Sequence, residues 1–311
     1  MARTVIRKTS GQINVSFPNS SDHASSQAVQ RYPSQALDMD QHAALNRVMR
    51  QLDRLVGLYH VKDFVYEIYS WLYITQRRRE VGLKAAQQSL HMIFKGNPGT
   101  GKTTVARILG SLFQEMGVLS KGHLVEVERA DLVGEYIGHT AQKTKETIKK
   151  ALGGILFIDE AYALARGGEK DFGKEAIDTL VKGMEDHKDE FVLILAGYPY
   201  EMNYFLTTNP GLPSRFPLQM EFHDYTVSEL LKIAEIMVED RDYRLSEQAK
   251  RTLKQKIYLE IQRQPENFSN ARFVRNLIEK AIREHAVRML KQKDYSKADL
   301  MNLSAQDFVN H

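Results

Sequence analysis

The sequence contains no cysteine, which excludes disulfide bonds and thiolate zinc sites and is compatible with a reducing compartment. Its ten histidines are not spaced as H-E-x-x-H or in a similar metal-ligand pattern. No run of apolar residues approaches the roughly 18 that a membrane span needs, and the N-terminus lacks the apolar core of a secretory signal. We therefore expect a cytoplasmic protein without a membrane span.

Charge of neither sign is in large excess, because 43 basic and 39 acidic residues leave a formal net charge of +4. The one dense basic cluster, Arg77-Arg78-Arg79, falls at the end of a predicted helix, where the helix dipole stabilises cations. The sequence has no basic stripe interleaved with aromatic residues, so we expect no nucleic-acid partner. With 42% hydrophobic and 26% charged residues, the 311-residue chain has the composition of a globular protein with about two domains.

The most informative stretch is Gly96-Asn97-Pro98-Gly99-Thr100-Gly101-Lys102-Thr103, which fits the phosphate-binding pattern G-x-x-x-x-G-K-[ST]. An apolar run, 91–94, precedes it, and apolar residues at helical spacing follow it as far as Gly117. The pattern therefore predicts a loop between a buried strand and a helix N-terminus. In such a loop backbone N–H groups bind phosphate oxygens, Lys102 can reach the β- and γ-phosphates, and the Thr103 hydroxyl can ligate Mg2+.

Two adjacent carboxylates, Asp159 and Glu160, follow the apolar run 155–158. A buried parallel strand that ends in carboxylates places them at the carboxyl edge of the sheet, where ligands of open α/β sheets bind. Asp159 is suited to orienting a hydrated Mg2+ ion, and Glu160 is suited to polarising an attacking water. The two segments together predict a site that hydrolyses a nucleoside triphosphate.

The remaining pattern predicts three regions: a flexible polar arm at 1–45, a large α/β nucleotide-binding domain at 46–224 and a helical domain at 225–311. Strands are predicted at 91–94, 124–127, 155–158, 191–196 and 218–222, alternating with helices at 102–116, 140–151, 173–186 and near 200–206. Such alternation predicts a five-stranded parallel sheet covered by helices on both faces. The pattern is also helical from about 47 to 80, with an apolar stripe that must dock, and helices without clear strands are predicted at 227–240, 246–263 and 270–292. Residues 13–17 alternate and could form a short strand.

Five ordered segments resemble motifs of the AAA+ ATPases. Lys95 to Thr103 is similar to the Walker A motif, and Gly154 to Ala161 is similar to Walker B. The segments 133–140, 209–216 and 270–276 narrow the resemblance to the subfamily of red-type Rubisco activases and stage V sporulation proteins K, over roughly residues 50 to 300. The resemblance implies a P-loop NTPase domain with a small helical lid, ATP or ADP with Mg2+ as cofactors, and a nucleotide-dependent homo-hexamer.

The resemblance also implies roles for single residues. Val56, Gly57 and Leu58 match the segment that packs on adenine, and Asn97, Pro98, Gly99, Thr100, Gly101, Lys102, Thr103 and Thr104 match the phosphate cradle. Arg215 matches the arginine finger that reaches the γ-phosphate of a neighbouring subunit. Arg272 matches the second sensor arginine, a role that Arg275, one turn on, could share or take. The family commonly has a polar first sensor where this sequence has Ala196-Gly197-Tyr198, and Asn209 or the Tyr198 hydroxyl could substitute.

Tyr136, Ile137 and Gly138 match the pore loop of AAA+ rings that thread a polypeptide, and residues 166–173 would form a second pore loop or a flexible connection. The resemblance therefore implies an ATP-dependent protein-remodelling motor with an unidentified protein substrate, acting in sporulation. Two alternatives stay open: a nucleotide-switched ring scaffold that recruits partners without threading them, and a remodeller similar to the Rubisco activases.

Overall fold

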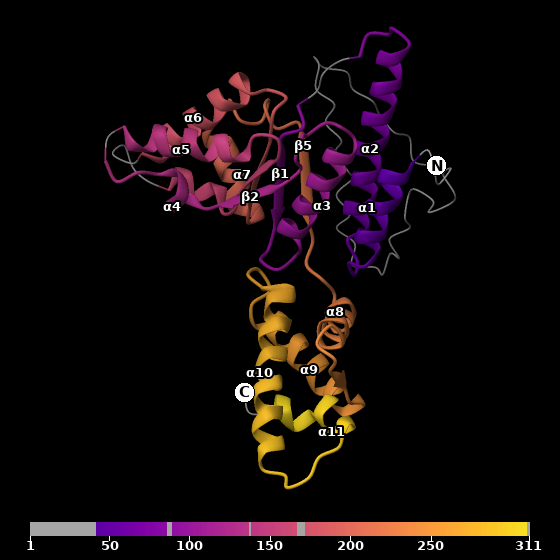
Figure 1. The fold of residues 1–311 in the computed structure, drawn as a ribbon. Coiled ribbons are helices and arrows are strands. Elements are labelled where there is room, and N and C mark those ends of the chain that lie inside the picture. Colours follow the sequence, from indigo (N-terminus) through magenta and orange to yellow (C-terminus); the bar gives the residue numbers. More distant parts are fainter. Residues whose placement is uncertain (1–41, 86–88, 137, 167–171, 310–311) are drawn as a thin grey trace, which may run out of the picture.

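The computed structural model describes residues 42–85, 89–136, 138–166 and 172–309. The predicted N-terminal arm, with its alternating stretch at 13–17, and most of the second pore loop lie outside these residues. Figure 1 shows an α/β part and a separate helical part, joined where the chain leaves the sheet at residues 223–226. Among the described residues, no helix has both the length and the apolar character needed to cross a membrane.

The α/β part is built on a parallel sheet of five strands in the order β2-β3-β4-β1-β5. The strands are β1 (Met92–Gly96), β2 (Leu124–Val127), β3 (Ile155–Ile158), β4 (Val192–Gly197) and β5 (Leu218–Phe222). The predicted five-stranded parallel sheet is confirmed. Every residue of β1, β3 and β4 is buried, because helices cover both faces of the central strands. The segments that follow these three strands all emerge at one edge of the sheet.

Two separate apolar clusters cover the faces of the sheet. Alternate residues of β1 serve different clusters: Met92 and Phe94 pack in one, and Ile93 packs in the other. The first cluster holds α1 (Ala43–Asp53), α2 (Tyr59–Glu80) and α3 (Lys102–Glu115). The second holds α5 (His139–Ala151), α6 (Gly173–Asp186) and α7 (Pro199–Thr208), with the short α4 (Arg129–Leu132) and η1 (Ala161–Ala165). In Figure 1, α1 and α2 lie at one end of this part, and α4 and α5 lie at the other.

The helical pattern predicted from about 47 to 80 is divided into two helices in the structure. Gly57 and Leu58 adopt left-handed backbone conformations, with φ of 66° and 55°, and this turn separates α1 from α2. The predicted apolar stripe of α2 docks on the sheet side, where Val61 and Val65 are fully buried against α1 and α3. The docked turn brings residues 54–58 close to the edge of the sheet where the phosphate loop lies.

The helical part has its own core and contains α8 (Val227–Glu239), α9 (Glu247–Arg263), α10 (Asn270–Leu290), α11 (Lys297–Met301) and η2 (Ala305–Phe308). The expectation of no strand in this region was wrong in one detail. Two strands of two residues each, β6 (Arg244–Leu245) and β7 (Asn302–Leu303), pair in parallel. Alternation over two residues is too short to be recognised in a sequence, and their pairing depends on tertiary contact.

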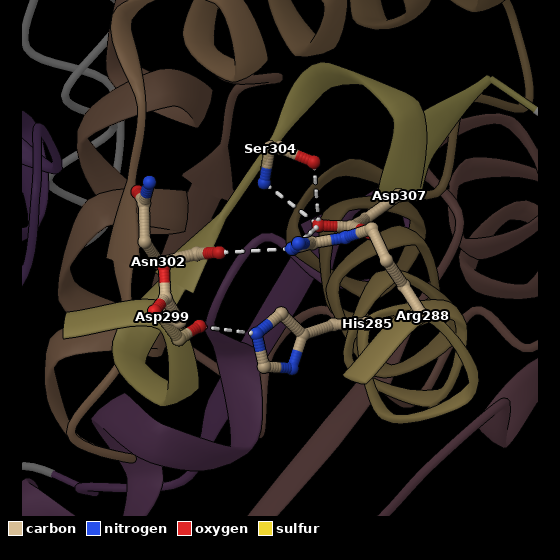
Figure 2. A network of polar contacts seen from close by, with 6 residues as sticks. All are labelled: His285, Arg288, Asp299, Asn302, Ser304 and Asp307. Carbon is tan, nitrogen blue, oxygen red and sulfur yellow. Dashed lines mark hydrogen bonds and ion pairs between the residues drawn. The ribbon is translucent and has the colours of Figure 1, made fainter. Parts of the chain in front are cut away.

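A polar network fixes the C-terminal segment on α10 (Figure 2). The Arg288 guanidinium donates to both oxygens of Asp307, at 2.8 and 2.9 Å, and Ser304 donates to Asp307 Oδ2 from its backbone N–H and its hydroxyl. His285 Nε2 lies 2.8 Å from the carbonyl oxygen of Asp299. Burial acts to raise the pKa of Asp307, but the hydrogen bonds from Arg288 and Ser304 outweigh it and keep this pKa below its ordinary value.

Candidate functional site

A cavity of about 410 Å³ lies between the carboxyl edge of the sheet and the helical part. Three groups of side chains and backbone line it: the phosphate loop (residues 96–103), the carboxylates after β3, and residues of the 54–58 turn together with α8 and α10. The structure thus brings Lys102, Thr103, Asp159, Glu160 and Arg272 to one cavity. Predicted nucleotide-binding residues from four parts of the sequence, 56–58, 98–104, 159–160 and 272, thus line one cavity, and their individual roles stay predictions.

The phosphate loop is shaped by glycines in conformations that other residues rarely adopt. Gly99 and Gly101 have φ of 71° and 100°, and α3 begins directly after Gly101, so a helix N-terminus faces the cavity. The Lys102 ammonium donates to the carbonyl oxygens of Gly96 at 2.8 Å and Asn97 at 3.0 Å. Burial lowers the pKa of Lys102, and the charge of Arg272 lowers it further, against the opposing effect of Asp159. A helix N-terminus, the Lys102 ammonium and the Arg272 side chain thus line one cavity, an arrangement that suits an anion.

Two residues of the predicted cradle, Asn97 and Thr100, use their side chains to hold the loop itself. The Thr100 hydroxyl donates to the carbonyl oxygen of Asn97 at 2.8 Å, and the Asn97 amide donates to Asp224 Oδ2 at 3.0 Å. Neither residue lines the cavity. Any contact of these two residues with phosphate would come from their backbone N–H groups.

The oxygen ligands in this cavity fit Mg2+. The Thr103 hydroxyl donates to Glu126 Oε1 at 3.4 Å, and Asp159 Oδ1 accepts the backbone N–H of Glu160 at 3.0 Å. Within the described part of the chain, no three His, Asp or Glu side chains are grouped so as to hold a metal unaided. Mg2+ commonly binds through one or two protein oxygens and takes its other ligands from phosphates and water, so the Thr103 hydroxyl and the Asp159 carboxylate are enough to fit it, and their role as ligands stays a prediction. Glu160, exposed and with φ of 48°, follows Asp159 and also lines the cavity.

The opposite wall of the cavity is apolar. Val56 and Leu58 come from the turn between α1 and α2, Tyr225 comes from the linker after β5, and Ile236 and Met237 come from α8. A wall of aliphatic and aromatic side chains suits a flat purine base. This wall matches the adenine-binding role expected for residues 56–58.

Gly57 stands behind the apolar wall, and it does not line the cavity. A Cβ atom at Gly57 would lie 2.5 Å from Glu229 Oε1 on α8, and the backbone φ is 66°. Gly57 therefore allows the turn to approach α8 closely, which positions Val56 and Leu58 on either side of it.

The three predicted arginines are placed differently. Arg272 and Arg275, both on α10, line the cavity. Arg215 does not: it precedes β5, at the amino edge of the sheet, where its guanidinium donates to Glu185 Oε1 and to the carbonyl oxygen of Gly211, each at 2.8 Å. Because all five strands are parallel, Arg215 and the phosphate loop lie at opposite edges of the sheet.

The described part of the predicted pore loop lies away from the cavity. Tyr136 is 65% exposed, and its ring packs edge-on against His139 at 5.4 Å between centroids. Ile137 lies outside the described residues, and Gly138 immediately precedes α5 with φ of 83°. The loop follows α4, beyond the edge strand β2, at the end of the sheet opposite α1 and α2 (Figure 1).

The geometry distinguishes the two candidates for the first sensor. Tyr198 lines the cavity, where burial and the nearby charge of Glu160 raise the pKa of its hydroxyl and keep it protonated. Asn209 does not line the cavity, and its amide donates instead to the carbonyl oxygen of Phe205 at 2.8 Å. The structure therefore brings the Tyr198 side chain, and not that of Asn209, to the site.

Three residues at the junction with the helical part were given no role from the sequence, although Asn270 begins the motif segment 270–276. Asp224 and Tyr225 follow β5, and Asn270 begins α10 with a left-handed φ of 47°. Tyr225 carries no motif of its own. Asn270 is the one of the three with a recognisable signal, because asparagine tolerates left-handed backbone and bonds well to nearby backbone groups.

Comparison with known proteins identifies the family. Residues 92–223 match the ATPase family associated with various cellular activities (AAA), and residues 226–311 match the AAA lid domain. The chain is 54% identical over 310 residues to stage V sporulation protein K of Bacillus subtilis (strain 168), covering 99% of this chain and 96% of that protein. It is 44% identical over 269 residues to the chloroplastic ribulose bisphosphate carboxylase/oxygenase activase of Cyanidioschyzon merolae (strain NIES-3377 / 10D), covering 85% and 91%.

Protein CbbX of Cereibacter sphaeroides is 46% identical over 244 residues, which is 78% of each chain. Among solved structures, the RuvB Holliday junction branch migration motor of Thermotoga maritima matches with a TM-score of 0.53 at 19% identity, over 83% of this chain and 69% of that one. At that identity the match shows a shared fold, and it agrees with a P-loop NTPase domain followed by a helical lid. The chain therefore belongs to the AAA ATPase family, among the relatives of stage V sporulation protein K and CbbX, and it is an ATPase with an AAA lid domain.

Proposed function

We propose that this ATPase is a protein-remodelling motor that assembles as a homo-hexameric ring and pulls a protein partner through its central pore. The observation that carries the proposal is the position of Arg215, at the edge of the sheet opposite the cavity that holds the other catalytic candidates. An arginine that cannot reach its own nucleotide can act only on a neighbour's, which requires a ring or filament of like subunits.

Each residue of the cavity has a role in this proposal. Lys102 and the N–H groups of the phosphate loop bind the β- and γ-phosphates, and Arg272 contacts phosphate from the lid. Thr103 and Asp159 hold the Mg2+ ion, which when bound neutralises charge on the phosphates. Glu160 polarises the attacking water, and Val56 and Leu58 pack on adenine. Positioning and charge neutralisation of this kind supply most of the catalysis in phosphoryl transfer.

Arg215 supplies the remaining positive charge from the adjacent subunit. Its guanidinium is about one-third exposed and is bound to the exposed carboxylate of Glu185, a surface pair that contributes little to stability and exchanges readily. It can therefore leave Glu185 for a phosphate when two subunits meet. In related phosphoryl transfers an arginine supplied in trans raises the rate by about 10³ to 10⁵.

Tyr136 is the residue proposed to grip the substrate. An exposed tyrosine offers apolar area and a polar tip, so it holds a polypeptide with little sequence preference. Gly138, with its left-handed backbone, allows the loop to turn directly into α5. The loop lies apart from the nucleotide cavity, so it can contact a substrate without obstructing ATP.

The place of this motor in sporulation, in the cytoplasm, is part of the same proposal. It is supported by the 54% identity to stage V sporulation protein K over 99% of this chain, against 44% to the Rubisco activase over 85%. Action on Rubisco is the second candidate, favoured by that lower but extensive similarity. A scaffold that assembles with ATP and recruits partners without threading them is the alternative that the experiments below separate.

The first test uses hydrolysis with an unstructured polypeptide, casein, as the probe. Glu160→Gln is expected to bind ATP and assemble but not hydrolyse it. Tyr136→Ala is expected to keep basal hydrolysis and lose stimulation by casein, whereas Tyr200→Ala, a change at a tyrosine that is 82% exposed elsewhere, keeps both. Stimulation that survives in Tyr136→Ala would favour the scaffold.

The second test captures the partner. The Glu160→Gln variant, held in ATP, is expected to retain its protein substrate on an affinity column. The Glu160→Gln/Tyr136→Ala double variant is the matched control, because it binds ATP equally well and lacks the proposed grip. A protein retained by the first and lost by the second is the threaded partner, and retention by both variants would argue against threading.

A further inference from the structure

The outer side of the phosphate loop is held by the lid and by the linker that leads to it. Three consecutive carbonyl oxygens of the loop accept hydrogen bonds from these segments. Pro98 O accepts from the Asn270 amide at 3.4 Å, Gly99 O accepts from the backbone N–H of Ala271 at 3.3 Å, and Thr100 O accepts from the Tyr225 hydroxyl at 3.1 Å. These three contacts are called the carbonyl clamp below.

The direction of these bonds connects them to nucleotide binding. When successive N–H groups of a loop turn toward a phosphate, the carbonyl groups of the same peptide planes turn away from it. A donor that holds a carbonyl from outside therefore fixes the peptide plane, and with it the direction of the N–H group inside. Each donor of the clamp acts on the cradle in this way from the outer side of the loop, and the Tyr225 ring also lines the apolar wall.

Asn270 connects the clamp to the rest of the junction. Its side chain is fully buried; Oδ1 accepts the backbone N–H of Tyr225 at 2.9 Å, while Nδ2 donates to Asp224 Oδ1 at 2.7 Å and to Phe268 O at 2.9 Å. The other oxygen of Asp224 accepts from the Asn97 amide, at 3.0 Å. The buried Asn270 amide thus bonds to the linker at Asp224 and Tyr225 and to the phosphate loop at Pro98, and Asp224 in turn bonds to the loop at Asn97.

The chemistry of this position requires asparagine. The site uses one acceptor and several donor contacts from a single side chain, and the backbone φ is 47°. Aspartate would supply no donor, and glycine would accept the backbone angle but supply no amide. Asparagine meets both requirements.

Close packing couples the loop to the lid as well. A Cβ atom placed on Gly99 would lie 2.5 Å from the carbonyl oxygen of Ser269 and 2.7 Å from the backbone nitrogen of Arg272. The loop therefore touches the first turn of α10, the same turn that carries Arg272 into the cavity. A rotation of α10 cannot move Arg272 without also moving Asn270 and Ala271, two of the three donors of the carbonyl clamp.

We propose that Asn270 and the Tyr225 hydroxyl are positioning residues of the ATPase, which hold the phosphate loop to the lid so that the cradle and Arg272 take their productive positions together. The proposal rests on ATP binding in this cavity and adds residues that act through the loop. It places the coupling between lid and nucleotide on both sides of the phosphates, through Arg272 inside the cavity and through the carbonyl clamp outside it.

Tyr225→Phe is the cleanest test, because it removes one hydroxyl and leaves the ring on the apolar wall. Loss of one hydrogen bond predicts a rise of about fivefold in the KM for ATP and in the dissociation constant for ADP, with a smaller change in kcat. Tyr204→Phe, at a tyrosine that is 66% exposed and outside the cavity, is the control and should change neither value. Asn270→Gly, which keeps the backbone angle and removes the amide, should weaken binding at least as much as Tyr225→Phe.

A double-mutant cycle separates positioning from a merely structural role. If the clamp acts together with Arg272, Tyr225→Phe has a clearly smaller effect on ADP affinity in an Arg272→Ala background than in the unmodified protein. Independent effects that multiply would overturn the proposal, as would unchanged KM and ADP affinity in Tyr225→Phe. Glu160→Gln is measured in parallel to test the proposed catalytic site separately from the clamp. Its loss of hydrolysis would support that site even if the Tyr225→Phe results overturn the role of the clamp.

Discussion

Arg215 and Glu160 lie at opposite edges of one sheet, and this separation predicts how mixed rings behave. Arg215 precedes the amino end of β5, and the phosphate loop follows the carboxyl end of β1, its neighbour in the sheet. The five residues of β5 span about 16 Å at 3.3 Å per residue, which is longer than an arginine side chain. A site assembled from two subunits is therefore expected, with Glu160 from one and Arg215 from the next.

The perturbation is a mixture of two inactive variants, Arg215→Ala and Glu160→Gln. Arg215→Ala alone should lose about 10³-fold or more in hydrolysis because the arginine that neutralises transition-state charge is missing at every site. In a one-to-one mixture that assembles at random, a site is complete when an Arg215→Ala subunit is followed by a Glu160→Gln subunit. Head-to-tail assembly then completes about one site in four.

The assay is steady-state phosphate release at equal total protein concentration, after the subunits have been allowed to exchange. The mixture is expected to hydrolyse ATP at about a quarter of the unmodified rate, although each variant alone is almost inactive. In the control mixture Lys188→Ala, a change at an exposed residue between α6 and β4, replaces Arg215→Ala. This mixture should give about half of the unmodified rate, because only the Glu160→Gln subunits are inactive. A mixture as inactive as its components would show that both residues act within one subunit and would refute the two-subunit site.

Three further predictions concern single groups. Burial lowers the pKa of His91 to about 4, and the neutral ring accepts the N–H of Leu193 at Nδ1. The neutral ring therefore contributes to the free energy of unfolding above pH 6.5, and about 3 kcal/mol of this contribution is lost as the pH falls from 6.5 to 4. His91→Asn should flatten this dependence in urea unfolding, and an equally steep curve would contradict it. Arg288→Met removes the ion partner of the buried Asp307 carboxylate, which keeps only its bonds from Ser304, and should destabilise the lid by about 3 kcal/mol, measured by hydrogen exchange on α10, with Arg283→Met as control. Gly99→Ala should weaken ATP binding without unfolding the sheet, since the added methyl would clash with the first turn of α10; unaltered affinity by calorimetry would refute that contact.

Much of the candidate site could be predicted because its parts are local. The phosphate loop is a continuous stretch in which residue type sets backbone geometry, and the two carboxylates follow a strand that its apolar run identifies. The parallel sheet then places both at one edge, since its strands all point the same way. The order of motifs along the chain was sufficient for the family assignment, because each motif is a short continuous segment that can be recognised without the fold.

The junction with the lid was not predictable in the same way. Three of the partners of Asn270, at Asp224, Tyr225 and Pro98, lie 45 or more positions away, and no local pattern relates an amide to partners at such separations. The pairing of β6 with β7 was missed for a similar reason, because each strand has only two residues. Tyr198 and Asn209 could not be ranked as sensor candidates until the fold placed one in the cavity and the other outside it.

The amino-acid sequence by itself determined the phosphate loop, the paired carboxylates, the buried strands and the helical lid, because each depends on residue type and spacing within a short segment. Only the tertiary structure decided which carbonyl oxygens of the loop are held by Tyr225 and Asn270, and that Arg215 lies at the edge away from its own cavity. These properties depend on where distant segments meet after folding, and such meetings follow from packing of the whole chain.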